Sequence, residues 1–336
     1  MPHEVDHRVA EALVAHAGHR HQKLPFEGFH SRLRRPLIYR TAAWRQYAGH
    51  EGLICQAFIR GHFRCIRAGM FRMIAALSVT LLASPVLAGA TDWQEIAPGV
   101  TARLISSDTL SDGLTMAGLE LVMPAGTKTY WRIPGETGIP TEFDFSASTA
   151  VTGSTVHWPF PEIDTSQGYM DYVYHGTVVL PVELEVSEGA VLDTIVTLGI
   201  CSDICVPATA RFTLPLTFAG PDSAQTIRLD QAMAQTPVLW DQPGEPVSVV
   251  TLGPSGSLYI EAPNPALDPA KFIADVGDPA ILFETPQKSP DGNLWTLKPL
   301  GGADTKGLEG SPVQLTFLTP TGPYAVTRTI VSSDPA

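Results

Sequence analysis

The chain has 336 residues, which is long enough for two or three domains. Residues 1–90 hold 12 of the 22 Lys and Arg residues but only 5 of the 34 Asp and Glu residues, so residues 91–336 carry 10 basic against 29 acidic residues, a formal charge of −19. Such an acidic body repels nucleic acid and anionic lipid, and we therefore exclude both as partners.

Residues 70–90 have the pattern of an export signal. Arg72 supplies the basic start, residues 74–83 (IAALSVTLLA) form a short apolar run, and the small residues at 86–88 and at 88–90 both fit a cleavage site. The run is about half of the ~20 residues that span a bilayer, so it predicts a cleaved signal rather than an anchor. We expect an exported, periplasmic protein with no membrane span in this chain.

Residues 1–69 precede this signal, although export signals stand at the start of a chain. We interpret them as a disordered upstream extension that results from a mis-assigned start, with Met70 or Met73 as the true start. Cys55 and Cys65 fall in this extension. The exported part then contains two cysteines, Cys201 and Cys205.

Residues 91–220 read as a series of short strands that are rich in β-branched and aromatic residues and separated by proline and glycine. This pattern predicts an all-β domain, an immunoglobulin-like antiparallel β-sandwich. The predicted strands cover residues 117–123, 128–133, 142–146, 154–158, 168–174, 177–186, 191–200 and 211–218.

Residues 221–245 are predicted to be a connector with a short helix. The helix over 222–235 has Asp222 or Ser223 as its N-cap, Ile227 and Met233 on its apolar face, and Pro237 beyond its end. Strand signals return in residues 246–336, which we expect to form a second, smaller β-sandwich domain. Its predicted strands cover residues 247–252, 257–262, 280–284, 293–297, 313–319 and 324–331.

The residues by themselves leave three roles open for Cys201 and Cys205. A disulfide would close a very small ring, worth roughly 2 kcal/mol as a structural staple in the chain-entropy model. Two thiolates at this spacing can also hold copper(I), whereas zinc would require four ligands. A close pair can instead exchange with a partner's disulfide. Asp203 lies between the cysteines, and the nearest cation along the chain is Arg211, so the sequence indicates no strongly activated thiolate.

Several blocks in a fixed order together resemble the N-terminal periplasmic domain of the DsbD family, and most of all its copper-sensitivity (ScsB-like) branch. The resemblance covers about residues 91–220, and residues 221–336 are similar to the second β region of that branch. The blocks are residues 130–138 (YWRIPGETG), 157–161 (HWPFP), 168–169 (GY), 180–182 (LPV) and 201–207 (CSDICVP).

The resemblance implies an immunoglobulin-like domain that belongs to a protein-disulfide reductase system and uses a redox-active disulfide rather than a bound cofactor. By position, Cys205 matches the cysteine that forms the mixed disulfide and Cys201 the resolving one. Tyr130 and Trp131 match an aromatic strand near the pair. The segment from Phe160 to Tyr169 matches a cap loop that shields it.

The family also implies partners. A membrane thiol reductant of the DsbD or ScsB type supplies electrons, and periplasmic thioredoxin-like proteins, disulfide isomerases or cytochrome c maturation thioredoxins receive them. This chain shows neither a membrane segment nor a thioredoxin-like module, so we expect a separate protein to be the donor. Without such a donor, the pair would either stay oxidised or serve copper handling and copper tolerance.

Overall fold

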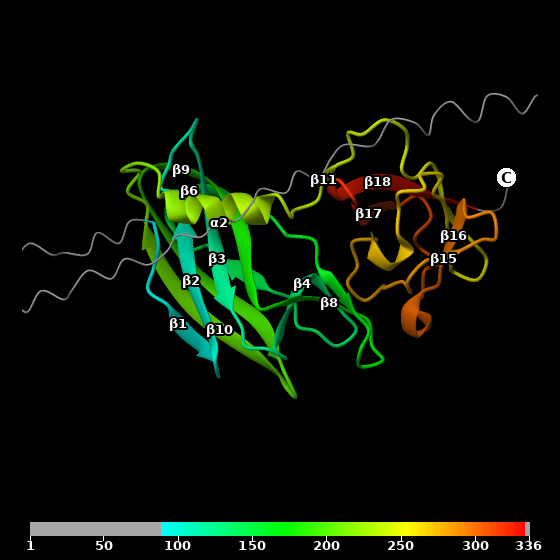
Figure 1. Ribbon diagram of the computed structural model, residues 1–336, viewed down its shortest axis with the longest axis horizontal. Coiled ribbons are helices and arrows are strands. Elements are labelled where there is room, and N and C mark those ends of the chain that lie inside the picture. The colour runs from blue at the N-terminus through cyan, green and yellow to red at the C-terminus, as the bar shows by residue number, and fades with distance from the viewer. Residues whose placement is uncertain (1–88, 333–336) are drawn as a thin grey trace, which may run out of the picture. The chain divides into compact units, whose positions relative to one another are not determined.

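The structure, a computed structural model, describes residues 89–332, which fold into two β-sheets and one short α-helix (Figure 1). The mostly-β fold expected from the sequence is confirmed. The expected extension over 1–69 and most of the expected signal lie outside the described residues.

The first sheet contains ten strands, and the neighbours along its main path are β1-β2-β3-β9-β4-β8-β7. Strands β10, β5 and β6 also pair with β9, and every pairing in this sheet is antiparallel. The strands are β1 (Gln94–Ala97), β2 (Val100–Ser106), β3 (Leu114–Val122), β4 (Lys128–Gly135), β5 (Glu142–Asp144), β6 (Thr149–Val156), β7 (Glu162–Asp164), β8 (Asp171–His175), β9 (Thr177–Cys201) and β10 (Cys205–Pro215).

Strand β9 organises this sheet. The sequence predicts two strands here, 177–186 and 191–200, but the structure has one strand of 25 residues. Gly189 has φ +79°, which only glycine adopts without strain, and the register with β6 jumps from Val186 to Val191. The chain therefore passes through residues 187–190 without reversing, so that β9 pairs with β3 in its first half and with β10 in its second.

The core of the first sheet consists of buried aliphatic and aromatic side chains from β2, β3, β4, β9 and β10. Its largest fully buried members include Leu104, Leu119, Trp131, Leu180 and Phe212. Strands β1, β2 and β7 were not predicted, and β1 and β7 are only four and three residues long.

Helix α2 (Ser223–Met233) lies across strands β2, β3 and β9 (Figure 1). Asp222 is its N-cap, as one of the two predicted possibilities. The predicted apolar face was wrong, because Ile227 is 57% exposed, whereas Leu229 and Ala232 are buried. Leu229 packs over Gly118, where a Cβ would lie 2.9 Å from the Leu229 methyl carbon Cδ2, so the missing side chain at 118 selects this face of the helix.

The second sheet contains eight strands in the order β14-β17-β18-β12-β13-β16-β15, with β11 also paired to β18. Unlike the first sheet it is mixed, because β11 and β12 both run parallel to β18. The elements are β11 (Val238–Leu239), β12 (Val250–Leu252), β13 (Leu258–Glu261), the 3₁₀ turn η1 (Pro269–Lys271), β14 (Phe272–Asp275), β15 (Gln287–Lys288), β16 (Leu294–Leu297), the 3₁₀ turn η2 (Leu300–Gly302), β17 (Pro312–Thr319) and β18 (Gly322–Ser332).

This sheet has its own aromatic core, in which Phe272 stacks on Phe317 and meets Trp295 edge-on. The predicted strands over 313–319 and 324–331 are present as β17 and β18, which form an antiparallel hairpin. The predicted strand over 280–284 is absent from the described sheet apart from an isolated bridge at Phe283. Pro279 and Pro286 flank that segment and remove backbone donors that a strand there would need.

Candidate active site

The two cysteines face each other across the end of the β9–β10 hairpin. Cys201 is the last residue of β9, Cys205 is the first residue of β10, and residues 202–204 form the connecting loop. They are directly opposite each other in the antiparallel register, with their Cα atoms 4.0 Å apart, and their sulfurs form a disulfide. The spacing of three residues between the cysteines is therefore that of a hairpin whose end is closed covalently.

The two sulfur-bearing residues differ in their access to solvent. Cys201 is 1% exposed, whereas Cys205 is an exposed residue and is preceded by Ile204, which is 75% exposed. The disulfide therefore faces solvent on the Cys205 side.

The alternation of side chains along β9 explains why Cys201 is buried away from the main core. Leu198 and Ile200 point into the core of the first sheet, whereas Cys201 points to the other face and packs with Tyr130 and Val173. Gly199 lies on that same face, where a Cβ would be 3.1 Å from the ring carbon Cδ2 of Tyr130.

Tyr130 on β4 contacts the disulfide directly. Its hydroxyl donates to Cys201 Sγ at 2.9 Å and lies 3.4 Å from Cys205 Sγ. Glycines make room for its ring on two sides, because a Cβ at Gly138 would lie 2.3 Å from the ring carbon Cδ1 and one at Gly199 would also be too close. The ring is consequently held in one position against the disulfide.

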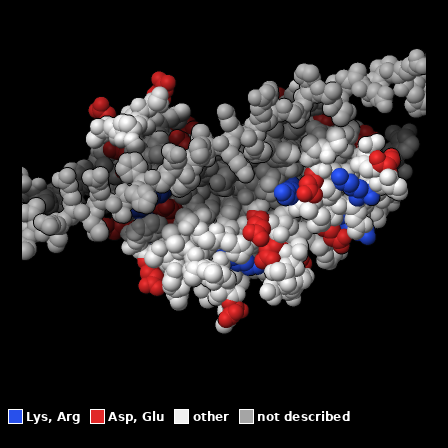
Figure 2. Space-filling view, viewed as in Figure 1, with Lys and Arg blue, Asp and Glu red and all other residues white. Residues whose placement is uncertain are grey.

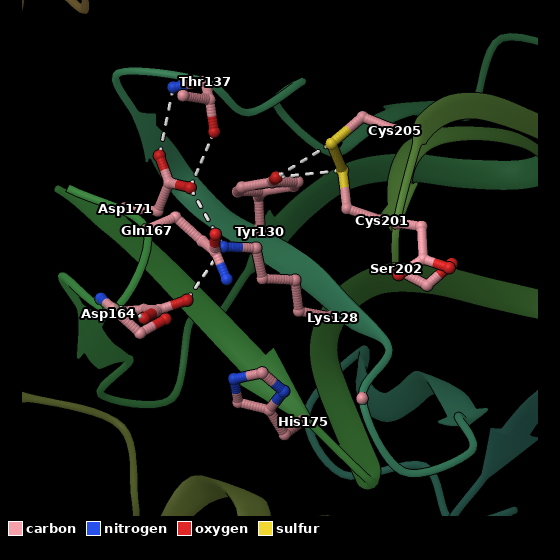
Figure 3. A pocket seen from close by; sticks show the side chains of 13 residues that line it. Lys128, Tyr130, Thr137, Asp164, Gln167, Asp171, His175, Cys201, Ser202 and Cys205 are labelled. Atoms are coloured by element: carbon pink, nitrogen blue, oxygen red, sulfur yellow. Dashed lines mark hydrogen bonds and ion pairs between the residues drawn. A yellow bond between two sulfur atoms is a disulfide. The ribbon is translucent and has the colours of Figure 1, made fainter. Parts of the chain in front are cut away.

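A partly buried polar network lies on the other side of the Tyr130 ring (Figure 3). Lys128 Nζ is 2.8 Å from Asp164 Oδ2 and 3.1 Å from Asp171 Oδ2. The Asp171 carboxylate also accepts hydrogen bonds from the amide and the hydroxyl of Thr137, at 3.0 and 2.7 Å. These contacts join β4, β7 and β8 around a single lysine.

The network shifts the ionisation of its members. Burial raises the pKa of Asp164, but hydrogen bonds from Lys128 and Ser166 outweigh this and hold the pKa well below its usual range. Burial lowers the pKa of Lys128, but its hydrogen bonds to Asp164 and Asp171 reverse the effect and raise it. Burial raises the pKa of Tyr130, because the phenolate would be poorly solvated. At neutral pH, Lys128 is charged and Tyr130 keeps its proton.

The disulfide and this network line one pocket of about 500 Å³. Its walls also include His175, whose Nδ1 is 3.2 Å from the Thr127 carbonyl oxygen, and Asp203 from the hairpin loop. Acidic side chains are spread over the face of the protein shown in Figure 2. The site thus combines an exposed cysteine residue with a polar pocket beside it.

The structure brings Tyr130 to the cysteine pair but places the other expected surrounding residues elsewhere. Trp131 follows Tyr130 on β4, points to the opposite face and packs edge-on against Tyr172 in the main core. Phe160 is partly buried against that same core. Tyr169 is 55% exposed and does not line the pocket. Between them, Asp164, Ser166 and Gln167 do line it, so the expected cap segment reaches the site through polar side chains.

Sequence reasoning missed the polar residues of this site. It considered Arg211 as the nearest cation, but Arg211 pairs with Asp193, whereas Lys128 is opposite Cys201 in the strand register. The signal that could have revealed these residues is a charged residue within an aromatic strand. Lys128 begins the segment 128–133 (KTYWRI), and Asp171 lies in the middle of the segment 168–174 (GYMDYVY).

Two further findings concern metal binding and membrane spans. Within residues 89–332, no three or more His, Cys, Asp or Glu side chains are grouped in a way that could hold a metal ion. The described helix is also neither long nor apolar enough to cross a bilayer.

The fold and the site together define an all-β protein with an accessible disulfide at the end of a hairpin. Residues 98–217 match the family model described as "Thiol:disulfide interchange protein DsbD, N-terminal". This segment of the chain therefore matches the DsbD N-terminal domain family, as the resemblance indicated.

A solved structure supports the same fold. The chain is similar to the crystal structure of the N-terminal periplasmic domain of ScsB from Proteus mirabilis, with a TM-score of 0.58 and 24% identity, over 73% of this chain and 99% of that one. No curated protein matches the chain.

Proposed function

We propose that this protein is a thiol–disulfide interchange module that passes electrons through Cys201 and Cys205. The observation that carries this proposal is the disulfide between a buried and an exposed cysteine at the end of a hairpin, within a domain of the DsbD N-terminal family. A structural staple gains nothing from leaving one of its two residues open to solvent, whereas exchange requires it.

The proposed reaction has two steps. A thiolate of a reduced partner attacks Cys205 Sγ, forms a mixed disulfide with it, and breaks its bond to Cys201, whose sulfur leaves with the electron pair. A second thiolate of the partner then attacks the partner sulfur that is bonded to Cys205 Sγ. The mixed disulfide breaks, and Cys205 is released as a thiolate. The partner becomes a disulfide, and this protein holds two thiols that reduce the next acceptor by the reverse sequence.

We propose a separate membrane thiol reductant of the DsbD or ScsB type as the donor and periplasmic thioredoxin-like or isomerase proteins as acceptors. The family of residues 98–217 supports partners of this kind. The exposed Ile204 and Val206 beside Cys205 provide apolar contact area for a docking protein.

A trapping experiment tests the proposal. The Cys201→Ser variant retains the accessible Cys205 thiol but lacks the resolving one, so it should accumulate a mixed disulfide with a periplasmic protein. The matched Cys205→Ser variant, which retains only the buried Cys201, should accumulate much less. Equal trapping by both variants, or trapping by neither, would contradict the assignment. A reduction potential below about −300 mV would indicate a structural bridge instead.

Copper(I) binding by the same two sulfurs would be a different function from thiol–disulfide exchange, and it is tested by a different measurement. Copper(I) titration of the reduced protein would reveal one tight site that is lost in either serine variant. Trapping without such a site supports exchange alone.

We also propose that the protein is exported and that the signal is cut after Ala88. Of the two cleavage positions that fit the sequence, only this one leaves Gly89 and Ala90 in the mature chain. Gly89 accepts a hydrogen bond from the Ser106 amide at 2.7 Å, and Ala90 is buried beside Leu229 of α2. Cleavage after Ala90 would remove both contacts.

A further inference from the structure

The hydroxyl of Tyr130 distinguishes between the two sulfurs of the disulfide. It is 2.9 Å from Cys201 Sγ and 3.4 Å from Cys205 Sγ, so its stronger hydrogen bond goes to the buried sulfur (Figure 3). The shorter contact belongs to the sulfur that has to leave as a thiolate when Cys205 is attacked.

The position of this hydroxyl is built into the fold. The ring fits where Gly138 and Gly199 lack side chains, and it packs against Val173 and Cys201 in a buried cluster. The backbone carbonyl oxygen of Tyr130 accepts a hydrogen bond from the Thr141 hydroxyl at 3.3 Å. A donor that is already oriented before the reaction needs no reorganisation when charge develops.

The Tyr130 hydroxyl is protonated at neutral pH and can therefore donate a hydrogen bond to a sulfur. Burial raises the pKa of Tyr130, so the phenol keeps its proton over the neutral range. Lys128 is the charged group on the other side of the ring, with its Nζ 5.9 Å from the ring centre, and Asp164 and Asp171 hold it there. Tyr130 is thus a neutral donor rather than a negative group that would repel a thiolate.

We propose that Tyr130 is a catalytic residue that stabilises Cys201 as the leaving thiolate. The proposal rests on the proposed exchange at Cys205. As the partner thiolate bonds to Cys205 Sγ, the S–S bond breaks, and Cys201 Sγ takes its electron pair while accepting the Tyr130 O–H hydrogen bond. No proton has to be transferred in this step. In the reverse direction the same hydrogen bond favours the thiolate form of Cys201, which resolves the mixed disulfide.

The expected effect of losing the Tyr130 hydroxyl follows from the chemistry of the leaving thiolate. Thiol–disulfide exchange is faster when the leaving thiol has a lower pKa. A hydrogen bond to an ionised acceptor is about twice as strong as a neutral one, so we expect its loss to raise the Cys201 pKa by about one unit or more and to slow the reaction several-fold to tenfold.

The test uses Tyr130→Phe, which removes only the hydroxyl, with Tyr174→Phe as the matched control. Tyr174 is also a buried tyrosine of the first sheet, but its hydroxyl donates to the Pro159 carbonyl oxygen at 2.7 Å and not to a sulfur. Two quantities are measured: the rate at which dithiothreitol reduces each oxidised protein, and the pKa of Cys201 in a Cys205→Ser background from thiolate absorbance against pH.

We expect dithiothreitol to reduce the Tyr130→Phe variant more slowly than the wild type, and we expect the Cys201 pKa to be higher in this variant. Tyr174→Phe should change neither the reduction rate nor the Cys201 pKa. An unchanged Cys201 pKa in Tyr130→Phe, or an equal effect in Tyr174→Phe, would overturn the proposal. If Tyr130→Phe fails to fold, 3-fluorotyrosine at position 130 alone retains the ring and strengthens the donor. It should lower the Cys201 pKa, and a pKa that does not fall would likewise overturn the role.

The failure of this proposal is separable from failure of the proposed function. Dithiothreitol is a small dithiol and needs no docking surface. A protein whose reaction with dithiothreitol depends on Tyr130, but which never traps a protein partner, would refute the interchange function and leave the role of Tyr130 intact.

Discussion

Lys128 and Asp164 form an ion pair, with 2.8 Å between Nζ and Oδ2, that ties strand β4 to the short strand β7 at the edge of the disulfide pocket. Both side chains are 15% exposed, so solvent screens this pair less than it screens a surface pair. Together with the pairing of β7 to β8, it holds the segment after Pro161 close to the strand that carries Tyr130.

The first prediction concerns the pH dependence of this pair. The folded pKa of Asp164 is lowered, so the pair stabilises the fold above the unfolded pKa of about 3.9, and this stabilisation is lost as the pH falls below it. The raised pKa of Lys128 keeps its contribution intact up to about pH 10. Asp164→Asn should therefore lower the free energy of unfolding at pH 7 by about 1–2 kcal/mol, and the deficit should shrink at pH 3.

Urea unfolding at the two pH values measures this effect. Asp203→Asn is the control, because Asp203 lines the same pocket but makes no ion pair within residues 89–332. A deficit of the same size at pH 7 and pH 3 would show that Asp164 acts through packing rather than through its charge.

The second prediction concerns the space around the Tyr130 ring. In Gly138→Ala the new Cβ would lie 2.3 Å from the Tyr130 ring carbon Cδ1 and 2.6 Å from Pro134 Cβ, so the ring must move. Overpacking of this kind costs about 1–3 kcal/mol of stability, and reduction of the disulfide by dithiothreitol should slow as well. Gly307→Ala is the matched control, because a Cβ there meets nothing within 4 Å. Wild-type reduction rates in Gly138→Ala would show that the ring position does not matter.

The third prediction concerns Asp108, a buried carboxylate away from the disulfide. It accepts hydrogen bonds from the amide and the hydroxyl of Thr217 and from the amides of Phe218 and Ala219. Asp108→Ala would leave these partly buried amides without their acceptor and should cost about 1–3 kcal/mol of unfolding free energy. Asp108→Asn keeps one acceptor oxygen and should cost less.

The backbone at Asp108 needs its own control, because its φ is +53°. Asp112 has φ +52° but is exposed and accepts no hydrogen bond within the described chain, so Asp112→Ala measures the backbone cost alone. Thermal and urea unfolding compare the three variants. Equal losses in Asp108→Ala and Asp112→Ala would rule out the hydrogen bonds as the cause.

The fourth prediction concerns the start of the exported protein. If the signal is cut after Ala88, the intact mass of the protein isolated from the periplasm should correspond to a chain that begins at Gly89. A chain that begins at Thr91 should be less stable, because it lacks the Ser106–Gly89 hydrogen bond and the burial of Ala90. A periplasmic mass that begins at Thr91, or a cytosolic protein that retains residues 1–88, would contradict this cleavage.

Much of the fold could be predicted from local patterns. Strands β3, β4, β17 and β18 consist of β-branched and aromatic residues between proline or glycine signals, and such runs are readable one at a time. The continuity of strand β9 could not be predicted, because a glycine inside a strand, such as Gly189, and a glycine in a turn give the same sequence signal. The face of helix α2 was not readable either, because it depends on the gap over Gly118 in another element.

The sequence by itself determined which residues are available for chemistry, namely one close pair of cysteines in the expected exported part, among strands that carry aromatic residues. Only the tertiary structure decided which sulfur is open to a partner and what surrounds the other one. Lys128 is 36 residues from Asp164 and 43 from Asp171, and Tyr130 is 71 from Cys201. Their meeting depends on strand pairing and register, which arise from the packing of the whole sheet rather than from any local pattern.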